Sequence, residues 1–245
     1  MSLLQILQDQ PCAYLPDRRA QIRYRLMESC DRTEYQHLLE RGWRRFGMTF
    51  FRPECSACRA CRSLRIDVET FEPTRSMRRT LAKNRDLDLT LCKATLGPQH
   101  LDLYQRYHAD MQARRGWPIR PMTARTYLHT FLEGRQDFGH ELRLSLGDRL
   151  LALSMVDVLP AGISAVYTVY DPEHRDRGLG VRAILGAIEL ARERGLPYVY
   201  LGHWIEENVS MSYKSSYRPH ELLDHRPEIN ERPRWSSPTP PGDRG

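Results

Sequence analysis

The stretch that decides the fold is Ile163–Trp204, which reads ISAVYTVYDPEHRDRGLGVRAILGAIELARERGLPYVYLGHW. β-branched and aromatic residues at 163–171 and 198–204 predict two strands. Between them, apolar residues recur at helical spacing over Leu179–Arg194, and a glycine and a proline follow directly. A strand, a long helix and a second strand in this order predict a mixed fold of the α+β or α/β class.

Further segments extend this pattern toward both ends of the chain. The expected elements are an extended segment at Ala20–Met27, a helix at Thr33–Arg41 that Thr33 caps and Gly42 ends, short strands at Met48–Arg52 and Leu64–Val68 that flank a cysteine run like a hairpin, a helix from about Thr74, a strand at 87–94, helices at His100–Gln112 and Ala124–Glu133, strands at 141–147 and 150–159, and a short helix at Met211–Ser216. We therefore expect an N-terminal cysteine-containing α/β lobe at 1–90, a second lobe at 91–224 and a disordered Pro-rich tail at 225–245.

Composition fits a globular cytoplasmic protein. The 245 residues are 40% hydrophobic and 28% charged, and no apolar run approaches the roughly 20 residues that span a bilayer. The N-terminus lacks a secretory pattern, so we expect reduced thiols and no disulfide framework. The net charge of +6 is compatible with a polyanionic partner such as RNA. Only three of the basic residues are lysines, and such a skew toward arginine also arises in a GC-rich genome.

Three cysteines stand at a C-x₂-C-x₂-C spacing, at Cys55, Cys58 and Cys61. Two-residue gaps let several thiolates converge on one zinc ion or iron–sulfur cluster, and the spacing does not decide between these. The alternative is that the three cysteines are reduced, bind no metal and pack within the expected hairpin.

A tetrahedral site would need a fourth ligand. Cys12, in PCAYLP, is the best candidate in the sequence. Cys30 is the alternative, and His37 is less attractive because it lies within an expected helix.

A glycine-containing loop, Arg175–Gly180, lies between an expected strand and the long helix. Gly178 and Gly180 leave room for backbone N–H groups and a helix N-terminus to approach an anion. The loop resembles the R/Q-x-x-G-x-G/A loop of the GNAT acyltransferases, which binds the pyrophosphate of coenzyme A. The alternative is an ordinary glycine-rich turn at a helix start.

The block Tyr198–Leu223 combines aromatic side chains, a lone lysine and neighbouring acidic residues. Tyr198 and Tyr200 share one face of a strand, which ordinary β packing also explains. Lys214 stands among aromatic and hydroxyl residues, although a solvated helix position is the usual setting of a lysine. No Ser-His-Asp, H-E-x-x-H or P-loop arrangement supports a hydrolase or an NTPase.

Several motifs in order identify a family resemblance. They are PCAYLP, Y-x-x-L-L-x-x-G-x-R-R-x-G from Tyr35 to Gly47, R-P-x-C-x-x-C-x-x-C, S-x-x-R-x-x-x-K-N from Ser76 to Asn84, DLYQRYH, YTVYDP and YLGHWIEENVSMSYKSSYRPHELL. Over residues 11 to 224 the chain resembles the bacterial aspartate/glutamate leucyltransferase branch of the aminoacyl-tRNA–protein transferase family.

The resemblance implies a GNAT-like acyltransferase fold and transfer of leucine from leucyl-tRNA to an N-terminal Asp or Glu, which marks the protein for N-degron proteolysis. An aminoacyl ester is already activated, so neither an enzyme nucleophile nor a cofactor is required for the chemistry. Most of the rate should come from holding amine and ester together and stabilising the oxyanion. The implied partners are leucyl-tRNA and acidic protein N-termini, with neither DNA nor a membrane involved.

The resemblance also suggests roles for named side chains. Tyr167, Tyr170, Tyr200, Trp204 and Met211 would contact the terminal adenosine or the leucyl group, together with the loop of Gly178 and Gly180; Asp171 or Glu206 would orient or deprotonate the amine; Tyr213 and Lys214 would face the oxyanion or the tRNA 3′ end; and Arg44, Arg45 and Arg65 would hold the acidic side chain. Two alternatives remain: a coenzyme A-dependent N-acetyltransferase, which leaves the cysteine lobe unexplained, and a non-enzymatic metal- or RNA-binding module, which leaves the aromatic block unexplained.

Overall fold

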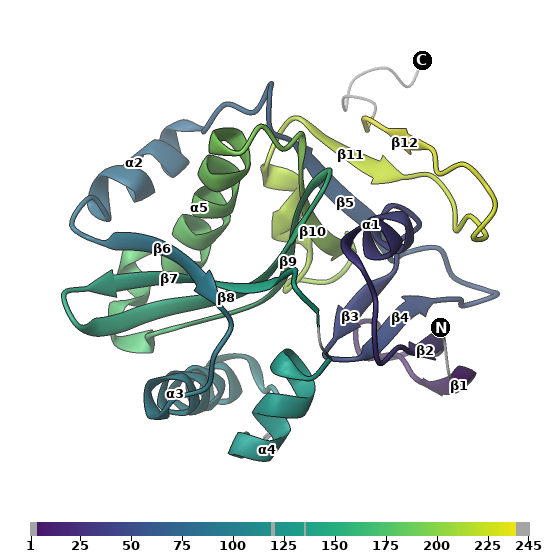
Figure 1. The fold of residues 1–245 in the computed structure, drawn as a ribbon, viewed down its shortest axis with the longest axis horizontal. Coiled ribbons are helices and arrows are strands. Elements are labelled where there is room, and N and C mark those ends of the chain that lie inside the picture. The colour runs from purple at the N-terminus through teal and green to yellow at the C-terminus, as the bar shows by residue number, and fades with distance from the viewer. Residues whose placement is uncertain (1–3, 119–120, 135, 239–245) are drawn as a thin grey trace.

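Two sheets organise the computed structural model, which describes residues 4–118, 121–134 and 136–238 (Figure 1). The smaller sheet has the strand order β1-β2-β4-β3, and the larger has the order β12-β11-β5-β10-β9-β8-β7-β6. This mixture of helices and largely antiparallel strands confirms the α+β class.

The elements have the following bounds: β1 Leu4–Pro11, β2 Arg19–Leu26, α1 Arg32–Glu40, β3 Arg44–Phe46, β4 Thr49–Pro53, β5 Arg62–Asp67, α2 Arg75–Lys83, β6 Asp88–Lys93, α3 Pro98–Arg115, α4 Ala124–Tyr127, the π-helical turn η1 Leu128–Leu132, β7 Gly139–Leu146, β8 Arg149–Leu159, β9 Gly162–Tyr170, the 3₁₀ segment η2 Pro172–Arg177, α5 Leu179–Glu193, β10 Tyr198–Trp204, the 3₁₀ segment η3 Ser212–Ser216, β11 His220–Leu223 and β12 Trp235–Ser236. Among the described helices, none is long and apolar enough to cross a membrane.

Helices cover both faces of the larger sheet. α5 and α2 lie side by side on one face, and α3 and α4 lie on the other (Figure 1). β8 is therefore buried along nearly its whole length, because its two sets of alternating side chains enter two different cores. The strand-helix-strand unit predicted at 163–204 is β9, α5 and β10, and it lies at the centre of this arrangement.

Two helix starts can be compared with the sequence predictions. The helix predicted to start near Thr74 is α2, and Thr74 caps it by accepting a hydrogen bond from Met77 N at 3.3 Å. The predicted cap at Thr33 is wrong, because Asp31 caps α1 by accepting from Glu34 N at 2.8 Å. An aspartate is as good an N-cap as a threonine, and this one lies two residues earlier.

The predicted hairpin around the cysteines is wrong. β4 pairs with β2 and β3, whereas β5 pairs with β10 and β11, so the cysteine run connects two different sheets. Both β5 and β6 belong to the larger sheet, so the boundary expected at residue 90 falls within the chain segments that build that sheet. Short strands close in sequence suggest a hairpin, but their pairing is decided by distant strands.

The prediction of a disordered tail does not hold for residues 225–238. The Arg226 guanidinium donates to Cys55 O and Cys58 O, both at 2.7 Å. Further on, β12 pairs with β11, and Trp235 donates to Glu40 O at 3.2 Å. A composition rich in proline and arginine therefore does not prevent order here, because backbone carbonyls elsewhere accept from these side chains. The rest of the predicted tail, 239–245, lies outside the described residues.

Candidate active site where β9 and β10 separate

The central feature of the site is a gap between two parallel strands. β9 and β10 pair only over three positions, from Tyr198–Gly162 to Tyr200–Ser164. Beyond them β10 continues along β5 and β9 continues along β8, so the two strands diverge. This divergence is the arrangement expected of a GNAT-like fold.

Gly202 shapes the β10 side of the gap. Its φ of +76° accompanies a break in the register between β10 and β5. A Cβ at this position would lie 3.2 Å from the Nε of Arg44. Glycine is therefore required both by the backbone conformation and by the close approach of a guanidinium.

Arg44 projects from β3 into this gap. Its Nη1 donates to Ser164 Oγ at 3.1 Å, and its Nη2 donates to Ala165 O. The side chain is 93% buried, since only 7% remains exposed. Within the described ranges no carboxylate lies within 4 Å of its nitrogens. A buried guanidinium that has only neutral acceptors is a ready binding partner for an anion.

Lys214, in η3, is a second buried cation near the gap. Its Nζ donates to His203 O at 2.6 Å and contacts Met211 Sδ at 3.1 Å. Burial, with a smaller contribution from Arg44, lowers the pKa of Lys214 to about 7. Burial and the same two cations lower the pKa of His203 to about 3, so its imidazole is neutral. His203 stands in the sequence within YLGHW, but a single histidine in a strand does not by itself indicate a functional role.

Two predicted aromatic residues, Trp204 and Tyr213, lie on the segments that frame this lysine. Trp204 donates from Nε1 to Ser212 O at 3.2 Å and thereby anchors η3 to β10. Tyr213 is 48% exposed. Burial and the neighbouring Tyr170 raise the pKa of Tyr213, and Tyr213 contributes in turn to the raised pKa of Tyr107, so the three hydroxyl groups lie near one another.

A separate aromatic group lines β9 and α3. Tyr170 meets Tyr107 edge to face at 4.9 Å. Tyr167 forms a hydrogen bond with His108 Nε2 at 2.9 Å, and His108 in turn stacks on Tyr104 at 4.1 Å. The histidine in this stack was not selected from the sequence, because its partner is 59 residues away.

The other two predicted arginines already have acidic partners. Arg45 forms an almost fully buried ion pair with Asp157. Arg65 pairs with Glu221 at 2.6 Å and lies between the rings of Tyr198 and Trp235. Tyr200 belongs to this second region, because its hydroxyl accepts from Gln36 at 3.2 Å and its ring packs on Trp235. The structure therefore separates these three residues from the gap.

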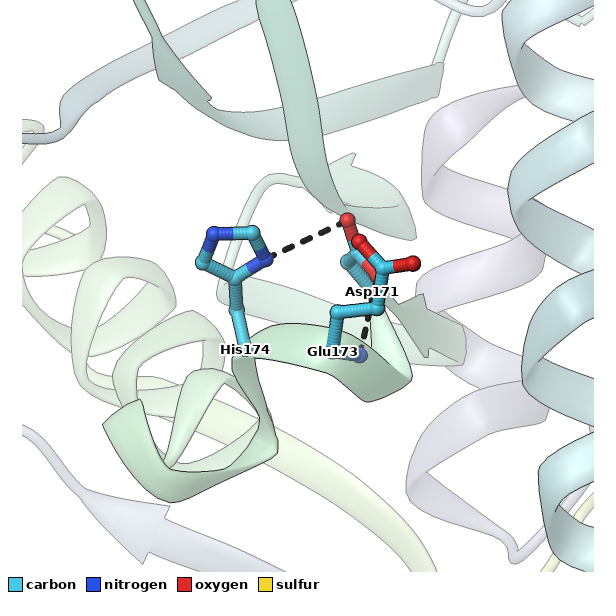
Figure 2. A group of neighbouring side chains, drawn as sticks. All are labelled: Asp171, Glu173 and His174. Carbon is cyan, nitrogen blue, oxygen red and sulfur yellow. Dashed lines mark hydrogen bonds and ion pairs between the residues drawn. The ribbon is translucent and has the colours of Figure 1, made fainter.

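Asp171 lies in a cluster of charged groups at the end of β9. Arg106 and Arg149 donate to its two oxygens at 2.6 and 2.7 Å, and Glu173 N donates at 3.1 Å. Burial acts to raise the pKa of Asp171, but these hydrogen bonds hold it below its usual value. Figure 2 shows His174 and Glu173 beside it, the one set of three metal-ligand types that converges among the described residues. Two arginines already neutralise Asp171. We therefore assign this cluster the structural role of holding η2 at the end of β9. Glu206, the other carboxylate considered, is exposed.

The glycine loop is held by α2. Lys83 Nζ donates to Asp176 O at 2.7 Å, and Asn84 Nδ2 donates to Arg177 O at 2.8 Å. A Cβ at Gly178, which has a φ of +68°, would contact Thr80 of α2, and one at Gly180 would contact the Tyr170 ring at 3.5 Å. The S-x-x-R-x-x-x-K-N motif therefore packs against the loop that the sequence analysis compared with a coenzyme A site.

The four cysteines predicted as ligands lie near one another, but in the described part of the chain no three of their sulfurs lie within 4.8 Å of one another. Burial and the charges of Cys12, Cys55 and Cys58 raise the pKa of the Cys61 thiol to about 12. Gln21 N donates to Cys55 Sγ at 3.4 Å, and Arg18 donates to Cys58 Sγ at 3.3 Å. Four sulfur donors are the ligand set that zinc and iron–sulfur clusters take, and N–H groups aimed at sulfur orient such ligands.

The alternative ligands lie elsewhere. Cys30 is buried in the core around Tyr35 and Phe50. His37 Nε2 contacts Ile229 O at 2.8 Å. Neither side chain contributes to the group around Cys61.

Comparison with known proteins identifies the family of the chain. The family described as "Arginine-tRNA-protein transferase, N terminus" matches residues 10–79, and "Arginine-tRNA-protein transferase, C terminus" matches residues 99–224. A Helicobacter hepaticus relative named "Aspartate/glutamate leucyltransferase" is 38% identical over 91% of this chain and 93% of its own length. A Halorhodospira halophila relative of the same name is 40% identical over 88% and 91%. The solved structure titled "The structure of L-PGS from Bacillus licheniformis" aligns over 65% of this chain and 57% of that chain, with 14% identity and a TM-score of 0.46.

These matches define the class first: the protein is an aminoacyltransferase that works on protein N-termini with charged tRNA as donor. The chain belongs to the arginine-tRNA–protein transferase family, and its curated relatives are leucyltransferases by name.

Proposed function

We propose that this protein transfers leucine from leucyl-tRNA to the N-terminal Asp or Glu of cytoplasmic proteins and so marks them for N-degron proteolysis. The names of its relatives support the donor and the acidic acceptors. The observation that carries the acceptor assignment is Arg44, a buried cation without an acidic partner among the described residues, beside the gap between β9 and β10.

The acidic acceptor would supply the charge that Arg44 lacks. A side-chain carboxylate of the acceptor would form a charge-assisted pair with the guanidinium, which Ser164 and Ala165 hold in place. Arg45 and Arg65 are unsuited to this role, because each already pairs with an acid. A neutral or basic first residue would leave the cation unpaired and would bind more weakly.

Lys214 would move the proton. In its neutral form its two N–H groups face His203 O and Met211 Sδ, which leaves the nitrogen lone pair for the acceptor's α-ammonium. The freed amine attacks the leucyl carbonyl, the C–N bond forms, and the ester C–O bond then breaks. The leaving ribose oxygen takes the proton from Lys214, and the attacking nitrogen loses its second proton to water, so that a neutral amide and a free ribose hydroxyl result. A lysine of pKa about 7 is matched to an amine whose ordinary pKa is about 8.

The rival acetyltransferase reaction is less well supported. The relatives reported above are leucyltransferases by name and not acetyltransferases. The cysteine-containing segment would also have no role in it, whereas here Arg18 pairs with Glu207 and Asn208 donates to Tyr14 O, so that segment supports the chain between β10 and η3.

The first experiment is transfer of radiolabelled leucine from charged tRNA to peptides beginning with Asp, Glu, Arg or Ala, with acetyl-CoA as a parallel donor. Leucine incorporated only into the Asp and Glu peptides supports the proposal. Equal labelling of the Ala peptide would remove the role given to Arg44. Acetylation without leucine transfer would overturn the function as a whole.

We also propose that Cys12, Cys55, Cys58 and Cys61 hold a zinc ion or an iron–sulfur cluster with a structural role. When bound, the metal would supply positive charge to four thiolates that otherwise repel one another. Metal analysis of anaerobically purified protein, with an absorption spectrum, distinguishes zinc from iron–sulfur. Cys61→Ser should lose the metal, and Cys30→Ser should keep it. Metal retention in the first variant would contradict the assignment.

A further inference from the structure

Helix α2 presents basic side chains that have no acidic partner in the described part of the chain. Arg75, Arg78, Arg79 and the following Arg85 are all exposed, and none of them lies within 4 Å of a described carboxylate. The sequence from Pro73 to Arg85, PTRSMRRTLAKNR, contains no acidic residue. The surface of this helix is therefore uniformly positive.

This concentration of positive charge destabilises helix α2. Arg75 and Arg79 stand four positions apart, where like charges repel. Arg75 also occupies the first turn, where the helix dipole disfavours a cation and where α2 has no acidic residue. In α3, by contrast, Arg106 and Arg114 are each paired with an aspartate one turn earlier, Asp102 and Asp110. The arginines of α2 therefore remain available to an external anion.

An open hollow of about 550 Å³ continues this surface at the C-terminal end of α2. Lys83, Arg85, His174 and Arg177 line it. Its two acids, Asp86 and Asp176, are each bound by one of these cations, which leaves Arg85 as a cation that no described acid neutralises. The basic side chains Lys83, Arg85 and Arg177 outnumber the two carboxylates of the lining, and this excess of positive charge favours a phosphate group over a neutral one.

The surface is linked to the gap through side chains already described. The hollow borders η2, η2 follows Tyr170 at the end of β9, and Tyr170 lies beside the Gly180 position and Tyr213. Tyr213 directly precedes Lys214. A single-stranded 3′ end that leaves α2 can therefore reach the gap by passing over aromatic rings, on which bases stack.

We propose that α2 and the hollow at its C-terminal end bind the phosphate backbone of the tRNA acceptor arm and direct its 3′ end toward the gap between β9 and β10. This inference rests on the proposed function for the identity of the RNA. Arginines in an acid-free row suit a phosphate backbone, which is read by charge and shape.

The test measures binding of a fluorescently labelled, uncharged leucine-tRNA transcript to the full chain over a range of salt concentrations. The variant is Arg75→Gln with Arg79→Gln, because glutamine keeps helix propensity and neither arginine forms an ion pair with any described residue. The matched control is Arg232→Gln with Arg234→Gln, which removes the same charge from exposed positions near β12, on the other side of Figure 1.

The α2 variant should bind the transcript at least about tenfold more weakly near physiological salt. The slope of log K against log salt concentration should fall by about one for each arginine removed. In the transfer assay the KM for charged tRNA should rise, while the KM for the acceptor peptide stays the same. The control variant should behave as the native chain does.

Unchanged affinity and slope in the α2 variant would overturn the inference, as would an equal loss in the control. Equal, α2-dependent binding of a DNA duplex of the same length would also overturn it, because the surface would then be a general polyanion site. Failure of the proposed function is distinguishable: native protein that binds the transcript through α2 but transfers no leucine retains this surface and loses the reaction.

Discussion

The two ends of β9 place buried charge in opposite situations. Near its start, Arg44 and Lys214 are buried, and no described acid pairs with either. Just past its end, Asp171 is buried and receives hydrogen bonds from both Arg106 and Arg149. Burial alone therefore does not identify a working group. The two cases differ in whether the fold itself neutralises the buried charge. A charge that the fold neutralises stabilises the fold, whereas a buried charge without a partner is available to bind a ligand.

The largest effect should follow from removal of the proton acceptor. Lys214→Ala should lower leucine transfer by about 10²- to 10⁴-fold, the usual contribution of a general base. Transfer should be measured under saturating tRNA and peptide, so that binding does not limit it. The thermal midpoint should stay near that of the native chain, because the alanine removes a buried cation that the fold does not neutralise. Native-like turnover would refute the role of Lys214.

Arg45→Gln removes the cation of the buried ion pair with Asp157 and should therefore affect stability. It leaves the Asp157 carboxylate buried without its cation, which costs about 3–5 kcal/mol of unfolding free energy. Denaturant unfolding followed by circular dichroism measures this loss. The protein that remains folded should still transfer leucine to acidic peptides in preference to neutral ones. Loss of that distinction, with stability unchanged, would reverse the assignments of the two adjacent arginines.

Arg44→Gln is the matched variant one residue earlier. It should lower kcat/KM for Asp and Glu peptides by about 10- to 100-fold, since a hydrogen bond to a charged group is worth about 1.5–3 kcal/mol. The kcat/KM for the Ala peptide should change little. The ratio of kcat/KM for acidic peptides to kcat/KM for the Ala peptide should therefore fall. An equal loss for all peptides would show that Arg44 maintains the strands and does not recognise the acceptor.

Asp171→Asn should destabilise the protein by about 2 kcal/mol and leave turnover per folded molecule unchanged, because the amide replaces a carboxylate that two arginines hold. The pKa of Asp171 is lowered in the fold. Its stabilisation is therefore fully present above the carboxyl's ordinary pKa of about 3.9 and is lost as the pH falls through the lower folded value. Unfolding curves at pH 7 and pH 3 should differ less in the variant than in the native chain.

The sequence predicts the local elements of this fold better than their partners. The periodicity of residues 163–204 is enough to predict β9, α5 and β10, because alternation and helical spacing are local properties. The pairing of β5 with β10 is not local, so a hairpin was the natural but wrong expectation. The same limit applies to the site. Arg44 and Arg45 are indistinguishable in the text RGWRRFG, and only the positions of Ser164 and Asp157 separate an anion-binding side chain from a structural one.

The smallest effect, and the finest test of the comparison, is the pH dependence of transfer. Burial lowers the pKa of Lys214 to about 7, and the neutral form is the proton acceptor. The rate should therefore rise several-fold between about pH 6 and pH 8 and then level off. The acceptor's α-amine titrates near pH 8 and would produce a similar rise. Acceptors whose amine pKa differs separate the two causes: the step near pH 7 should persist with every acceptor in the native chain and disappear in Lys214→Ala. A step that follows the pKa of the acceptor amine would mean that the substrate alone titrates, and Lys214 would then act only as a fixed charge at the gap.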